Sequence, residues 1–136
     1  MSNPLVRKDV LEADPASQLV MPGANAVYRV GAETFMNVTG PEPAFVGAIW
    51  GTSEDLEDVF DFYRRELPRL GWTDDGKGIG TTYESIIWLW CKPGMVFRLG
   101  FVDPRDYDQI PPVVDWHQFT TVFDARLQSG RSCPRT

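Results

Sequence analysis

The chain has 136 residues, 43% hydrophobic and 12% aromatic, a composition that suits one domain with a packed core and excludes a disordered polymer. Its formal net charge of −6 disfavours nucleic-acid binding, because neutralising phosphates requires a basic surface. No window approaches the roughly 18 apolar residues of a membrane span, so we expect a soluble, acidic protein.

The first 25 residues are expected to form an N-terminal arm. Asn3 could cap a short helix that starts at Pro4, and Pro15 and the segment 21–23 would break it. Charged residues stand where a signal peptide needs an apolar run, and no cysteine is placed for lipid attachment. The sequence therefore predicts a cytoplasmic protein, and a cell-surface location would require the chain to be a processed fragment.

Two apolar stretches before residue 52 resemble strands. Residues 26–38 hold two short apolar runs around Gly31, and residues 40–43, rich in Pro and Gly, predict a break. Residues 44–51 are apolar at almost every position, which predicts a strand covered on both faces.

A long amphipathic helix is the strongest prediction. It would follow Thr52 or Ser53, with Thr52-x-x-Asp55 as a capping box, and it would end at Gly71. Its apolar stripe, spaced by three and four residues, consists of Leu56, Val59, Phe60, Tyr63, Leu67 and Leu70. Phe62 lies off this stripe, so we expect it to be exposed and to be a candidate protein-contact residue.

A hairpin is predicted after a turn-rich loop at 73–82. Alternating apolar residues in 84–91 and 95–102 would pair Trp90 with Phe97. A two-residue loop and a four-residue loop give this same register. Because a proline at the first position of a two-residue loop favours turns that splay the strands, we favour the longer loop.

The rest of the chain predicts one more strand. Residues 102–115 form an acidic, proline-rich connection. In residues 117–127 apolar and polar side chains alternate, which predicts a strand with one face exposed to solvent. Residues 128–136 form a polar C-terminal tail. The predicted fold is α+β: one long helix packed on a mainly antiparallel sheet of four or more strands, with a domain at 26–127 and extended N- and C-terminal arms.

No motif predicts catalysis, a cofactor or a metal. Gly71-x4-Gly76-Lys77-Gly78 lacks the Ser/Thr of a phosphate loop and contains two aspartates. His117, the only histidine, has Asp115 and Asp124 nearby in sequence, but no nucleophile motif accompanies them.

Three aspartates and the two cysteines also do not form a recognisable metal site or disulfide framework. Asp103, Asp106 and Asp108 miss the spacing of a calcium loop and are expected to be solvated. Cys91 and Cys133 are too few for a disulfide framework or a zinc site, so we expect free thiols.

One helix end carries a resemblance to known proteins: Tyr63-x3-Leu67-x3-Gly71-Trp72, with MPGA upstream at 21–24 and IIWLWCKPGMVFRLGFVDP at 86–104. This pattern resembles small uncharacterised bacterial proteins, many of them actinobacterial lipoproteins, over residues 21–127. The resemblance implies an α+β fold. It carries no activity, because the shared residues are core and cap positions.

These observations favour a non-catalytic accessory or structural subunit that binds a protein partner or forms a homo-oligomer. The alternative is a small-ligand-binding domain with a pocket between helix and sheet. An enzyme is the least favoured class.

Overall fold

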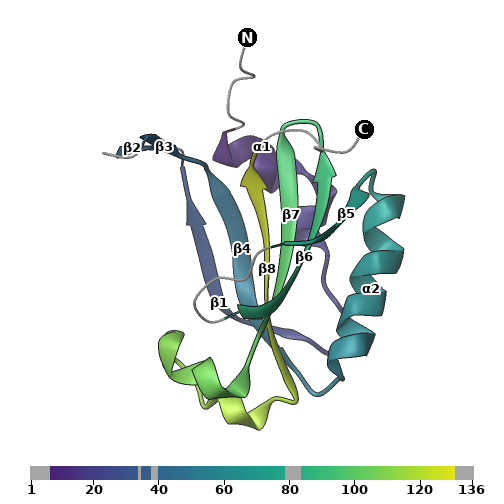
Figure 1. Ribbon diagram of the computed structural model, residues 1–136, viewed down its shortest axis with the longest axis vertical. Coiled ribbons are helices and arrows are strands. Elements are labelled where there is room, and N and C mark those ends of the chain that lie inside the picture. Colours follow the sequence, from purple (N-terminus) through teal and green to yellow (C-terminus); the bar gives the residue numbers. More distant parts are fainter. Residues whose placement is uncertain (1–6, 34, 38–39, 79–83, 131–136) are drawn as a thin grey trace.

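A six-stranded antiparallel sheet forms the centre of the molecule in the computed structural model, which describes residues 7–33, 35–37, 40–78 and 84–130 (Figure 1). The strands in spatial order are β1 (Asn25–Ala32), β4 (Phe45–Thr52), β8 (Thr121–Ser129), β7 (Met95–Val102), β6 (Glu84–Lys92) and β5 (Thr73–Lys77). Two short strands, β2 (Phe35–Asn37) and β3 (Gly40–Glu42), pair separately. The predicted mixture of helix with a mainly antiparallel sheet is confirmed.

Helix α2 (Leu56–Arg69) occupies the predicted position, but it begins differently from the prediction. Asp55 is its N-cap and makes no side-chain capping bond. The Thr52 hydroxyl instead accepts a hydrogen bond from the backbone N–H of Glu54 at 3.1 Å. The predicted capping box is therefore wrong. Gly71, at φ 91°, follows the helix in the left-handed conformation that favours glycine.

The buried face of α2 is wider than one apolar stripe. Val59, Tyr63 and Leu67 are buried as expected, whereas Leu56 is 37% exposed. Phe62 is only 9% exposed, and its ring packs edge to face on Tyr63 with centroids 5.2 Å apart. The predicted exposure of Phe62 is therefore wrong, because the core contacts α2 on the Phe62 side as well as on the Phe60 side.

The N-terminal segment packs on the same face of the sheet as α2. It contains α1 (Lys8–Ala13) and the 3-10 helix η1 (Pro15–Gln18), and it buries Leu11, Ala16 and Met21 in the same core cluster as Tyr63. Asp14, buried, pairs with Lys92 at 2.8 Å, which ties η1 to the end of β6. Residues 7–24 are thus part of the packed core and do not form the extended arm that their composition suggested.

The hairpin of β6 and β7 has the predicted register. Trp90 is opposite Phe97 and Trp88 is opposite Leu99, so the alternation of apolar residues identified the pairing correctly. The loop is the shorter alternative, Pro93-Gly94, and Gly94 has φ 80°. A glycine at this position accommodates the left-handed conformation that a proline-initiated type II turn requires. Our preference for a four-residue loop was therefore wrong.

Strand β8 is buried on both faces, although its alternation predicted one wet face. Phe123 and Leu127 face the helices, while Val122 and Asp124 are 1% exposed on the opposite face. Two ion pairs lie on that opposite face, Asp124 with Arg126 and Glu84 with Arg98 at 3.3 Å. Gly100 makes room for them, because a Cβ there would come within 1.6 Å of the Glu84 carboxylate.

The remaining connections differ from the predictions at their ends. Residues 40–42 and 73–77, expected as a break and a loop, are the strands β3 and β5. The acidic connection forms η2 (Pro104–Gln109), and η3 (Trp116–Gln118) replaces the predicted start of the last strand. Figure 1 shows these two turns at the opposite end of the sheet from α1.

Cys91 also differs from the prediction, because it is disulfide-bonded and is not a free thiol. The chain's one other cysteine, Cys133, lies outside the described residues, as does most of the predicted tail at 128–136. No helix in the described part of the chain is long and apolar enough to cross a membrane.

Candidate functional site

A cavity of about 440 Å³ lies between the N-terminal helices and the sheet. Its size falls within the range of small-molecule sites. The lining comes from α1, η1 and the residue after it, from the strands β1, β4, β7 and β8, and from Tyr63 of α2. The lining residues are Lys8, Glu12, Ala16, Ser17, Gln18, Leu19, Arg29, Val30, Gly31, Val46, Gly47, Ala48, Trp50, Tyr63, Phe97, Ala125 and Leu127.

The cavity exists because small residues occupy one corner of the sheet. On the face that α1 covers, β1 and β4 contribute Gly31, Val46 and Ala48, while the strands under α2 contribute Trp88 and Trp90. Large side chains fill the space beneath α2, whereas Gly31, Val46 and Ala48 leave space at this corner. The helices α1 and η1 therefore cover this corner without filling it.

Tyr63 is the polar group in the apolar interior of the cavity. It is 1% exposed, and its ring contacts the rings of Phe97 and Phe123 at centroid distances of 5.5 and 6.0 Å. Its hydroxyl makes no hydrogen bond to any described residue, and it is not among the fully buried atoms that lack a partner, so solvent in the cavity can reach it. Burial raises the pKa of the Tyr63 phenol well above its usual value of 10.0.

We expect Tyr63→Phe to make the protein more resistant to alkali without changing its stability at neutral pH. A hydroxyl without a protein partner contributes little to stability, so the variant should stay within about 1 kcal/mol of wild type at pH 7. The raised pKa keeps Tyr63 protonated in the folded state, while the unfolded chain ionises near pH 10. Wild type should therefore lose about 1.4 kcal/mol per pH unit above pH 10 through this residue, and the variant should not.

Urea denaturation of both proteins between pH 7 and pH 11 measures this difference. The comparison with the variant removes the contributions of all other titrating groups. Parallel stability curves for wild type and Tyr63→Phe over that range would contradict the burial of the phenol.

The charged residues of the lining lie at its solvent-exposed mouth. The Lys8 ammonium pairs with the Glu12 carboxylate at 3.2 Å, and both side chains are partly exposed. Arg29 is exposed and makes no hydrogen bond or ion pair with any described residue. Its position opposite Ala48 in the β1–β4 pair places it on the face of the sheet that the cavity occupies. The lining thus combines apolar side chains with polar groups and with the charged residues Lys8, Glu12 and Arg29.

Ser17 is the hydroxyl of the lining that could suggest a nucleophile. Its single O–H lies within hydrogen-bond distance of two backbone carbonyl groups, of Glu12 at 2.7 Å and of Asp14 at 2.8 Å. These bonds hold the junction of α1 and η1 together. The side chain therefore has a structural role that accounts for its position.

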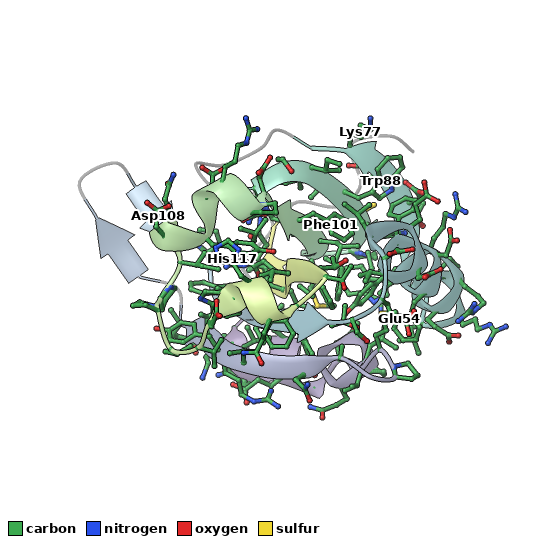
Figure 2. All side chains as sticks on the ribbon, turned by 90° about the horizontal axis from the view of Figure 1, so that it is seen from below. Glu54, Lys77, Trp88, Phe101, Asp108 and His117 are labelled. Atoms are coloured by element: carbon green, nitrogen blue, oxygen red, sulfur yellow. The ribbon has the colours of Figure 1, made fainter. Side chains whose placement is uncertain are left out.

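His117 and its neighbouring aspartates are not brought together as a catalytic group. Asp115 accepts a hydrogen bond from the backbone N–H of His117, and Asp124 lies in its ion pair with Arg126. The His117 ring packs on Tyr107 with centroids 4.8 Å apart. Figure 2 shows Asp108 of η2 and His117 of η3 at the same end of the molecule, apart from Trp88.

The aspartates of the acidic connection have structural partners. Asp103 caps η2 by accepting from the backbone N–H of Arg105, and the Arg105 side-chain hydrogen bond lowers the pKa of the Asp103 carboxyl. Asp106 accepts from Gln109 at 3.2 Å, and Asp108 lines a shallow hollow with His117. Within the described residues, no three potential ligands lie close enough to hold a metal ion.

Sequence reasoning identified Tyr63 only as a buried residue of the α2 stripe, and it did not single out Lys8 or Arg29. Nothing in their local spacing distinguishes them, because the cavity forms from segments that are distant along the chain.

Comparison with known proteins adds nothing to this geometry: no family model matches the chain, and neither a curated protein nor a solved structure was found to match it.

Proposed function

We propose that this protein is a non-catalytic binding protein for a small, mainly apolar molecule. The observation that carries the proposal is the cavity, with Tyr63 in its wall and no partner for the Tyr63 hydroxyl among the described residues. Binding sites of this class combine an apolar lining with a few polar groups that orient the ligand. Tyr63 would supply one such group, since a phenol can donate a hydrogen bond to a ligand oxygen and accept one as well.

The interaction role expected from the sequence has lost the features that motivated it. That expectation rested on arms that would need a partner to become ordered and on an exposed Phe62. Residues 7–24 instead bury Leu11, Ala16 and Met21 within the molecule, and Phe62 is buried against Tyr63. A pocket next to the sheet therefore supports the ligand-binding alternative better than a docking role.

Titration with N-phenyl-1-naphthylamine, a neutral apolar probe that fluoresces when shielded from water, tests the proposal. We expect saturable binding of one probe per chain to wild type. Ala48→Leu and Ala125→Leu add side-chain volume at two walls of the cavity, so each should weaken binding by about tenfold or more. Val113→Leu adds one methylene at a position that is 52% exposed in the distant connection, and it should bind like wild type.

The melting temperatures of the three variants show whether they are folded. A side chain that extends into an existing cavity should cost little stability, whereas overpacking a filled core costs about 1–3 kcal/mol. Absence of saturable binding to wild type would refute the proposal. Unchanged binding to both Ala48→Leu and Ala125→Leu would place the probe elsewhere and refute it as well.

A further inference from the structure

We infer that the ligand is an anionic amphiphile, with its apolar body in the cavity and a carboxylate at the mouth beside Arg29. This inference rests on the proposed function and specifies the class of molecule that the site would take. It depends on two features of the lining: the distribution of charge, and the lack of a partner for Arg29 among the described residues.

The distribution of charge fixes which end of the ligand lies inside. Trp50, Phe97 and Leu127 of the lining are buried, whereas its charged residues, Lys8, Glu12 and Arg29, are exposed or partly exposed. Burying an ionised group among the buried apolar side chains would cost several kcal/mol without compensation. An ionised headgroup must therefore remain at the mouth, where solvent and the charged side chains are.

Arg29 fixes the sign of that headgroup. Glu12 already compensates Lys8, and the Glu33 side chain accepts from the backbone N–H of Lys8 at 2.9 Å. Arg29 is left as the cation of the lining that has no partner among the described residues. Its planar guanidinium offers paired N–H donors that match the two oxygens of a carboxylate.

The alternatives fit the mouth less well. A cationic headgroup would meet the unpaired guanidinium, and Glu12 is already occupied by Lys8. A neutral alcohol would leave Arg29 without compensation and gain only an ordinary hydrogen bond, which is roughly half as strong as a charge-assisted one. Arg29 lies opposite Ala48 in the β1–β4 pair and belongs to the lining.

Competition against bound N-phenyl-1-naphthylamine tests this inference with two compounds of equal chain length, decanoate and decan-1-ol. We expect decanoate to displace the probe from wild type about tenfold more strongly than decan-1-ol at low ionic strength. Arg29→Gln should abolish the preference while still binding the probe. Lys77→Gln removes one positive charge from an exposed position on β5, outside the lining, and should keep the preference.

The outcomes separate this inference from the proposed function. Equal displacement by the two compounds, stronger displacement by decan-1-ol, or displacement by neither would overturn the anionic ligand class while probe binding upheld the pocket. A preference that survives in Arg29→Gln would overturn the role of Arg29. Absence of probe binding to wild type would refute the proposed function and this inference together.

Discussion

A chain that begins at Gly23 should lose about 3–6 kcal/mol of stability and fold only marginally. The missing segment would remove the buried side chains of Leu11 and Met21, each of which contributes about 1.5–3 kcal/mol through burial. It would also remove Asp14, the partner of Lys92. Because the whole stability of a small domain is about 5–15 kcal/mol, this loss should be visible in urea denaturation followed by circular dichroism.

Two point variants in α1 provide a matched control for the truncation. Leu11→Ala should cost about 2–5 kcal/mol, because Leu11 is fully buried. Val10→Ala makes a similar change at a residue that is 45% exposed, and it should stay within about 0.5 kcal/mol of wild type. A truncated chain as stable as the full one would show that α1 and η1 do not cover the sheet, and the cavity would then lose its outer wall.

The elements predicted correctly are those determined by short-range periodicity. The stripe through Val59, Tyr63 and Leu67 repeats every three or four residues, and a packed helix needs no distant information to be recognised. The hairpin register follows from alternation in two strands joined by a short loop, since a shift of one residue would place Arg98 opposite Trp88.

The N-terminal segment escaped prediction because its contacts are distant in sequence. Leu11, Ala16 and Met21 are five residues apart, which is not a helical or strand period. The pairing of Asp14 with Lys92 joins residues separated by 78 positions. Composition alone made this segment resemble an arm, and only the sheet that it covers shows what its apolar residues do.

The polar residues of β8 were misread for a related reason. Asp124 and Arg126 alternate with apolar residues, which is the pattern of a strand with one solvated face. The strand order places β8 between β4 and β7, with Glu84 and Arg98 on the same face. Local alternation could not reveal that these charges would be buried together on neighbouring strands.

The bonding of the cysteines could not be predicted from local sequence either. Their number and spacing did not reveal a bond, because pairing depends on distances in the folded chain. Cys91 is nevertheless disulfide-bonded. The expected free thiol at Cys91 is therefore wrong.

The cavity could not be predicted for a further physical reason: it forms where the residues of the sheet are small. Gly31 and Ala48 have ordinary sequence neighbours, and their small size matters only because α1 and η1 cover them. Tyr63 belongs to the apolar stripe, and its place in the lining of the cavity is a property of the tertiary structure. Candidate binding residues of this kind become recognisable only once the elements are in place.

Phe97→Ala should be among the most destabilising single substitutions, at about 3–5 kcal/mol. Phe97 is 2% exposed, and its ring lies 5.5 Å from Tyr63, 6.0 Å from Trp72 and 6.1 Å from Trp90, measured between centroids. It therefore joins the helix, the segment after it and the sheet. Because Phe97 also lines the cavity, its truncation would enlarge a space that the surrounding side chains already leave open.

Phe60→Ala is the matched control, because it makes the same chemical change on the same core. Phe60 is half-buried at the edge of the cluster, where it packs on Trp88 with centroids 4.9 Å apart, so its removal should cost only about 1–2 kcal/mol. Urea midpoints with unchanged slopes would give both values. Equal losses for the two variants, or a loss below about 1 kcal/mol for Phe97→Ala, would show that the core is not centred on Phe97 between α2 and β7. In that case the packing of Phe97 on Tyr63 and Trp90 would not be what holds this wall of the cavity in place.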